Sequence, residues 1–182
     1  MPTTPLNVKT HSHLFDSNSL YIGRVSRYIP SEAPAPLRNA LATGSGVLAN
    51  EFPLPSQHST AQRQLVIALK AQALARFMTL HPPSHPASKP LFFGTRSKLF
   101  CWCAPLACHG SLLLYLADRA TQLQLSTQSP SWLQLPSDMD NLYHLLLSPP
   151  ASLDPSNIPD NPYISLLCHQ LDLIAPPQQT LF

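Results

Sequence analysis

The chain has 182 residues, of which 44% are hydrophobic and only 11% charged, and it carries a net charge of +2 with its histidines neutral. This length suits one compact domain with an extension, and the apolar content is too high for wholesale disorder. The lysines and arginines are scattered singly, which argues against non-specific nucleic-acid binding. The longest apolar run, 112–117, is far shorter than the ~20 residues that span a bilayer, and no apolar leader begins the chain, so we expect a cytoplasmic protein without a membrane span.

The first strand is predicted at Leu20–Arg24, where bulky residues alternate and a Gly-Arg pair follows. Residues 1–18 before it are expected to form an N-terminal tail. Arg24 would then lie at a strand end, where its planar guanidinium could hold a phosphate or carboxylate. A lone arginine at such a place is also typical of a solvated strand end, so both interpretations of Arg24 stay open.

A long proline-rich loop is predicted from Pro30 to Pro55, with a helical turn at 37–41. A helix follows, capped by Ser59 or Thr60 and running from Gln62 to about Leu80. Its apolar residues at helical spacing predict which side is buried. The predicted buried stripe is Leu65, Leu69, Ala73, Phe77 and Leu80, with Gln64, Lys70 and Arg76 outside it.

Residues 81–90 contain several prolines and predict a linker. The next strand is predicted at 98–103, apolar throughout after its lysine, as expected of a strand buried on both faces. A turn at 105–110 and a helix from Ser111 to about Ala120 follow. The fold class is therefore α/β over residues 19–120, a small compact sheet flanked by helices.

Beyond residue 121 the sequence predicts a proline-rich, mostly helical extension that reaches residue 182. One helix would follow a cap at Ser137, and another would follow Asn161 with Pro162 at its first position. A loop at 149–159 would separate them. The apolar helices could pack on the same core or on a second subunit.

Three of the four cysteines lie in one segment, 101–110, which also holds a histidine. Cys101 and Cys103 share a strand face and point in parallel, so thiol or metal chemistry in a reducing compartment fits them better than a disulfide. Together with Cys108 and His109 they could form a Cys₃His zinc site, although this spacing is not that of the common zinc knuckles.

Two other interpretations of this segment stay open. Cys108 could be a reactive nucleophile, with His109 as its general acid or base. It would lie at a helix N-terminus and beside an imidazole, and both of these lower the pKa of a thiol. Cys101 and Cys103 could instead simply fill the core as small hydrophobic residues.

The order of motifs resembles the family catalogued as domain of unknown function 4326. The resemblance rests on Tyr-Ile-Gly-Arg at 21–24, on 48–52, on the helix at 60–80, and on Cys-Trp-Cys-Ala-Pro-Leu-Ala-Cys-His-Gly at 101–110. It spans about residues 19–120 and implies a compact α/β fold, with Asn50 as a ligand-binding residue. The family's Asn-Pro-Phe turn is Asn50-Glu51-Phe52 here, so, if that turn shapes a ligand pocket, this copy would bind differently or be degenerate.

Two functional hypotheses follow. In the first, the domain binds or processes a small phosphorylated or nucleotide-like ligand, with Arg24 as the anion clamp and Cys108 and His109 as catalytic groups. In the second, the Cys/His cluster, with or without zinc, only stabilises the fold of a non-catalytic module, whose loops and C-terminal helices contact a protein partner. The sequence names neither the ligand nor the partner.

Overall fold

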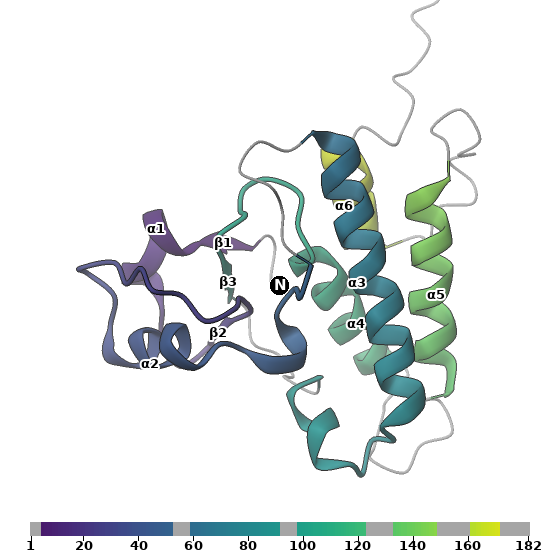
Figure 1. Ribbon diagram of the computed structural model, residues 1–182, viewed down its shortest axis with the longest axis horizontal. Coiled ribbons are helices and arrows are strands. Elements are labelled where there is room, and N and C mark those ends of the chain that lie inside the picture. The colour runs from purple at the N-terminus through teal and green to yellow at the C-terminus, as the bar shows by residue number, and fades with distance from the viewer. Residues whose placement is uncertain (1–4, 53–58, 92–97, 123–132, 149–160, 172–182) are drawn as a thin grey trace, which may run out of the picture.

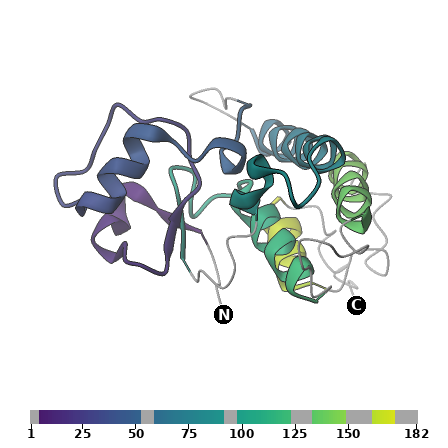
Figure 2. The ribbon, with the colours of Figure 1, turned by 90° about the horizontal axis from the view of Figure 1, so that it is seen from below.

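The computed structural model describes residues 5–52, 59–91, 98–122, 133–148 and 161–171. Three short strands form one sheet in the order β1-β3-β2, and both strand pairs are parallel. The sheet, α1 and α2 lie at one end of the molecule, and α3 to α6 lie together at the other (Figures 1 and 2). The predicted α/β class is confirmed. The elements are β1 (Leu6–Asn7), α1 (Val8–His11), η1 (Ser12–Leu14), β2 (Ser19–Tyr21), α2 (Ala35–Thr43), η2 (Gly46–Leu48), α3 (Thr60–Leu80), η3 (Pro86–Leu91), β3 (Lys98–Cys101), α4 (Gly110–Gln122), α5 (Gln134–Leu147) and α6 (Pro162–Gln170).

The central strand β3 is buried on both faces, as its apolar sequence predicts. Leu99 and Cys101 belong to the larger apolar cluster, which the helices share, whereas Phe100 belongs to a smaller cluster with residues of α1 and α2. Alternate residues of a strand point to opposite faces, so one strand anchors both clusters. The flanking strands are in register with it, with both Leu6 and Tyr21 opposite Phe100.

The N-terminal boundary predicted at residue 19 is wrong, because residues 6–14 fold as part of the domain. β1 pairs with β3, and Val8 of α1 is fully buried in the smaller cluster. The sheet therefore needs the segment that the sequence suggested was a tail. The stretch predicted as a loop with one helical turn contains a helix of nine residues, α2, whose Leu37 and Leu41 are buried in the same cluster.

The long helix α3 has the predicted boundaries but a different buried face. A capping box fixes its start, because the Ser59 side chain accepts from the Gln62 N–H and the Gln62 side chain accepts from the Ser59 N–H. Leu65 and Leu80 of the predicted stripe are 46% and 74% exposed, whereas Lys70, predicted outside it, is buried. The helix is covered by α5 as well as by the rest of the core, so its buried side is broader than one stripe.

The C-terminal helices pack on the same core. α5 runs along α3, and α6 packs against α4 (Figures 1 and 2). α5 begins at Gln134, three residues before the predicted cap at Ser137. α6 begins at Pro162 as predicted, with the Asn161 side chain accepting from the Tyr163 N–H at 2.9 Å. The predicted loop at 149–159 lies outside the described residues. None of the described helices is long and apolar enough to cross a membrane.

Candidate ligand-binding site

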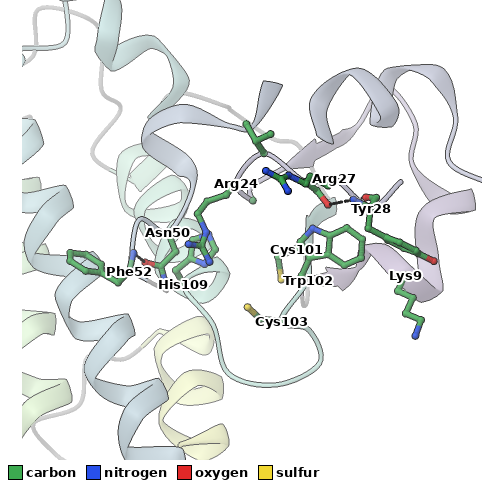
Figure 3. Close-up of a pocket in the computed structure, with 13 residues that line it drawn as sticks. Lys9, Arg24, Arg27, Tyr28, Asn50, Phe52, Cys101, Trp102, Cys103 and His109 are labelled. Carbon is green, nitrogen blue, oxygen red and sulfur yellow. Dashed lines mark hydrogen bonds between the residues drawn. The ribbon is translucent and has the colours of Figure 1, made fainter. Parts of the chain in front are cut away.

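A cavity of about 760 Å³ lies where the carboxyl ends of the three parallel strands meet. Parallel strands end at one edge of a sheet, and open α/β sheets bind ligands at that edge. The cavity brings together residues that are far apart in the sequence (Figure 3). Its described lining is Lys9, Gly23, Arg24, Val25, Ser26, Arg27, Tyr28, Asn50, Phe52, Cys101, Trp102, Cys103 and His109.

The cavity has a strongly positive lining. Lys9 comes from the turn of helix that follows β1, and Arg24 and Arg27 come from the loop that follows β2. All three side chains are exposed, and none of the described lining residues is acidic. In Figure 3, Arg24 reaches toward Asn50 and His109, whereas Trp102 and Tyr28 lie on the opposite side. The arrangement can attract an anion.

Besides the pairing of β2 with β3, the Tyr21 hydroxyl links the Tyr-Ile-Gly-Arg motif to the Cys-Trp-Cys motif. The Tyr21 hydroxyl donates to the backbone oxygen of Arg24 at 2.6 Å and accepts from Trp102 Nε1 at 3.1 Å. Gly23 is required beside it, because a Cβ there would lie 2.3 Å from the Tyr21 hydroxyl oxygen. The start of the Arg24 loop and the indole of Trp102 are thereby fixed relative to each other.

His109 holds the start of α4 against the end of β2. Its Nε2 donates to the backbone oxygen of Ile22 at 2.9 Å, while its Nδ1 is buried without a partner in the described structure. Burial lowers the pKa of His109 to about 4, although the hydrogen bond to Ile22 opposes this. The imidazole is therefore neutral at pH 7 and supplies no positive charge to a neighbouring thiol.

The three thiols lie close together, and the pKa values of two of them are raised. The sulfurs of Cys101 and Cys108 are 3.5 Å apart, and Cys108 Sγ accepts from the Gly110 N–H at 3.3 Å. Contact with Cys103 acts to lower the pKa of Cys101, but the contact with Cys108 and burial outweigh it and raise the pKa to about 12. Contact with Cys101 and burial raise the pKa of Cys103 well above its usual range.

Cys108 keeps only one of the two features on which its predicted catalytic role rests. Cys108 is buried and is not among the residues that line the cavity, whereas Cys101 and Cys103 are. The prediction rested on a helix N-terminus and a neighbouring imidazole: Cys108 Sγ does accept from the Gly110 N–H at the start of α4, whereas burial keeps His109 neutral.

The predicted zinc set does not assemble either. In the described part of the chain, no group of three or more His, Cys, Asp or Glu side chains is placed to hold a metal ion. Of the four predicted ligands, Cys101, Cys103 and Cys108 are neighbours, but His109 uses Nε2 to bind the Ile22 backbone. Nδ1 of His109 has no partner, so the bond that Nε2 makes does not by itself exclude a ligand role, but the described side chains are not placed around a common metal position.

Asn50, which the family resemblance assigned to ligand binding, lines the cavity together with Phe52. Its side-chain oxygen accepts from the Phe52 N–H at 3.1 Å, which fixes the turn. Glu51, which replaces the family's proline, points elsewhere and forms an ion pair with Lys70 at 2.8 Å. The departure from the family pattern thus leaves Asn50 and Phe52 in the cavity wall.

Sequence reasoning missed four lining residues. Lys9 was placed in a tail, and Arg27 and Tyr28 have no motif around them. Trp102 lies inside the Cys-Trp-Cys motif, yet only the cysteines were considered for chemistry. The sequence does carry one signal for Trp102. It directly follows the strand β3, whose parallel neighbour β2 leads to Arg24.

The model of the family described as domain of unknown function, DUF4326, matches residues 6–119. The chain belongs to this family. The match covers the sheet, the cavity and the helices up to most of α4, and it begins at β1, in agreement with the folded N-terminal segment. Comparison with curated proteins and with solved structures finds no match for the chain.

Proposed function

We propose that this protein binds a small phosphorylated or nucleotide-like ligand in the cavity at the carboxyl edge of its sheet. The observation that carries the proposal is the set of three cations, Lys9, Arg24 and Arg27, in a cavity with no acidic residue in its described lining. Arginine presents a planar fork that can bind two phosphate oxygens at once, and lysine adds a further positive charge. An anion in this cavity would meet several cations and no acidic side chain of the described lining.

The place and size of the cavity support the same proposal. Its volume of about 760 Å³ lies within the range of small-molecule sites, roughly 300–1,000 Å³. It opens at the strand ends where α/β sheets generally hold their ligands. Its lining also combines apolar surface with a few polar groups, which is typical of such sites.

Binding accounts for the site better than nucleophilic catalysis. The pKa values of Cys101 and Cys103 are raised, so both thiols are protonated at neutral pH, and His109 is neutral. Of the two predicted catalytic residues, only His109 lines the cavity. We therefore assign His109 to positioning the two motifs and Arg24 and Asn50 to the ligand. The crowded thiols also support a reducing compartment, the cytoplasm.

The second candidate is a non-catalytic module that its Cys/His segment holds together and that contacts a protein partner. It is favoured by the burial of Cys101, Cys108 and His109, of which the last two bond to backbone groups. In that case replacing Cys101, Cys103 and Cys108 together by alanine should unfold the domain. A folded triple variant that still binds phosphate compounds would favour the ligand-binding proposal.

Thermal unfolding with inorganic pyrophosphate tests the ligand-binding proposal. A ligand present at 100 times its Kd stabilises the folded state by about 2.7 kcal/mol, which should raise the Tm by roughly 5–10 °C for a chain of this size. We expect Arg24→Gln combined with Arg27→Gln to abolish the shift. The control is Arg76→Gln, an exposed arginine of α3 outside this cavity. Equal shifts in the double variant and the control, or no shift in the wild type, would contradict the proposal.

A further inference from the structure

We propose that the ligand is a nucleoside phosphate whose base stacks on the indole ring of Trp102. This inference rests on the proposed function and narrows it, because it names the class of ligand. It is carried by the placement of an indole in the same cavity as the cations, with a structural link between them.

Trp102 presents ring surface rather than a polar group to the cavity. It follows β3 directly and is half-buried, packing against the smaller apolar cluster while it also lines the cavity. Its only polar atom, Nε1, already donates to the Tyr21 hydroxyl at 3.1 Å. What the indole can offer a ligand is therefore its π surface, on which any nucleobase can stack.

A second aromatic residue supports the indole. The rings of Tyr28 and Trp102 meet edge to face, with their centroids 5.6 Å apart and their planes at 66°. Tyr28 is 55% exposed and comes from the loop that also carries Arg24 and Arg27. One loop thus places cations and an aromatic ring around the same space (Figure 3). A site for phosphate alone would need only the cations.

The link between the indole and the cations fixes how a ligand would lie. The Tyr21 hydroxyl binds both Trp102 Nε1 and the backbone oxygen of Arg24. A single hydroxyl group therefore bridges the indole ring and the backbone of Arg24. A ligand with its phosphate on Arg24 would have its far end within the same cavity as the indole. A phosphate, a sugar and a planar base joined in series match this arrangement, and the volume of about 760 Å³ leaves room for all three.

Fluorescence of Trp102 tests the stacking directly. The chain has two tryptophans, so Trp132→Phe leaves Trp102 as the only indole. We would titrate this variant with AMP, GMP, CMP and UMP, and separately with ribose 5-phosphate and inorganic pyrophosphate. At least one nucleotide should quench the emission and bind about 5- to 150-fold more tightly than ribose 5-phosphate, the range that corresponds to one stacked base. Ribose 5-phosphate and pyrophosphate should bind without that quenching.

Substitutions in the aromatic wall complete the test. In Trp102→Leu, nucleotides should bind no more tightly than ribose 5-phosphate binds to the same variant. Since Trp102→Leu could disturb folding, Tyr28→Ala is the second variant, because Tyr28 is largely exposed; it should weaken nucleotide binding several-fold. The matched control is Leu80→Ala, which truncates an exposed apolar side chain at the end of α3.

The outcomes separate this inference from the function on which it rests. Equal binding of nucleotides and ribose 5-phosphate, with no change in Tyr28→Ala, would overturn the nucleotide assignment while the phosphate site stands. Failure of pyrophosphate and of every phosphate compound to bind the wild type would overturn the proposed function as well.

Discussion

His109 joins the two sequence motifs that meet at the cavity. Its Nε2 donates to the backbone of Ile22 in the Tyr-Ile-Gly-Arg motif. Its own backbone oxygen accepts from the Leu113 N–H in the first turn of α4. Gly110 beside it has no room for a side chain, since a Cβ there would lie 2.5 Å from Pro5 Cγ. The histidine and the glycine therefore have packing and hydrogen-bonding roles at a point where the sequence alone suggested catalysis.

The buried imidazole should make folding depend on pH. Burial lowers the pKa of folded His109 to about 4, whereas an unfolded histidine titrates near 6.5. Between these values the unfolded chain binds the proton more readily, so the free energy of unfolding should fall as pH drops from 7 to 4.5, by about 2–3 kcal/mol from this group. Urea unfolding at pH 7 and 4.5 measures the change, and His109→Gln should reduce it by that amount.

The control for this prediction is His13→Gln, which replaces an exposed histidine. It should keep the pH dependence of the wild type, because this variant still contains His109 and all the acidic groups. If His109→Gln and His13→Gln show the same pH dependence, then His109 is not buried in its neutral form.

Residue types were enough to predict part of the site. Arg24, Asn50, Cys101, Cys103 and His109 line one cavity, as their places in the motifs suggested. Motif spacing could not show that His109 turns its ring to a backbone oxygen or that burial keeps the thiols protonated. Those properties depend on the surroundings that the fold supplies, so the metal centre and the nucleophile stay predictions that motif spacing alone could not refine.

At the scale of elements, α3 shows where helical periodicity is not enough. The predicted stripe placed Leu65 inside and Lys70 outside, and both assignments are wrong. Lys70 is 2% exposed because its Nζ finds two partners, the backbone oxygen of Val47 and the carboxylate of Glu51, each at 2.8 Å. A hydrophobicity pattern cannot foresee a buried lysine whose partners come from a distant loop.

Removing the carboxylate of Glu51 should destabilise the contact between this loop and α3. Burial lowers the pKa of Lys70, and the hydrogen bond with Glu51 opposes that shift, so the ion pair helps to keep the ammonium charged. Glu51→Gln would leave a buried ammonium without a counter-charge. We expect a loss of about 1–3 kcal/mol in the free energy of unfolding, less than for a fully buried pair because Glu51 is half-exposed.

Chemical denaturation of two further variants gives this prediction its controls. Lys70→Met removes the charge together with its need for a partner and should be milder than Glu51→Gln. Asp16→Asn breaks the more exposed pair with Lys98 and should be milder than Glu51→Gln. A Glu51→Gln variant as stable as Asp16→Asn would show that the Glu51 pair contributes little.

At the scale of the whole molecule, the folded unit extends further along the chain than the family match does. The match ends at residue 119, but α5 and α6 lie beyond it and cover α3 and α4. The sequence predicted both helices from their caps and apolar residues, yet it left open whether they cover this core or a second subunit. Only the packing of α5 along α3 decides between the two.

A fragment ending at Gln122 should therefore fail to fold cooperatively. It lacks the seven buried apolar side chains of α5 and α6 and exposes their contact surfaces on α3 and α4. Fully burying one such side chain contributes roughly 1.5–3 kcal/mol, so the loss would be comparable with the typical stability of a domain, about 5–15 kcal/mol, or larger. The lost side chains are Leu135, Met139, Leu142, Leu146, Ile164, Leu167 and Cys168.

Thermal melts followed by circular dichroism, with dye binding to exposed apolar surface, compare the fragment with the full chain. The full chain should melt cooperatively, and the fragment should bind dye and show no transition. Leu133→Ala with Leu147→Ala in the full chain is the control, because both leucines are exposed and their loss should leave the melt nearly unchanged. A sharp melt from the fragment would mean that residues 5–122 form a complete domain, on which α5 and α6 pack without being needed for its stability.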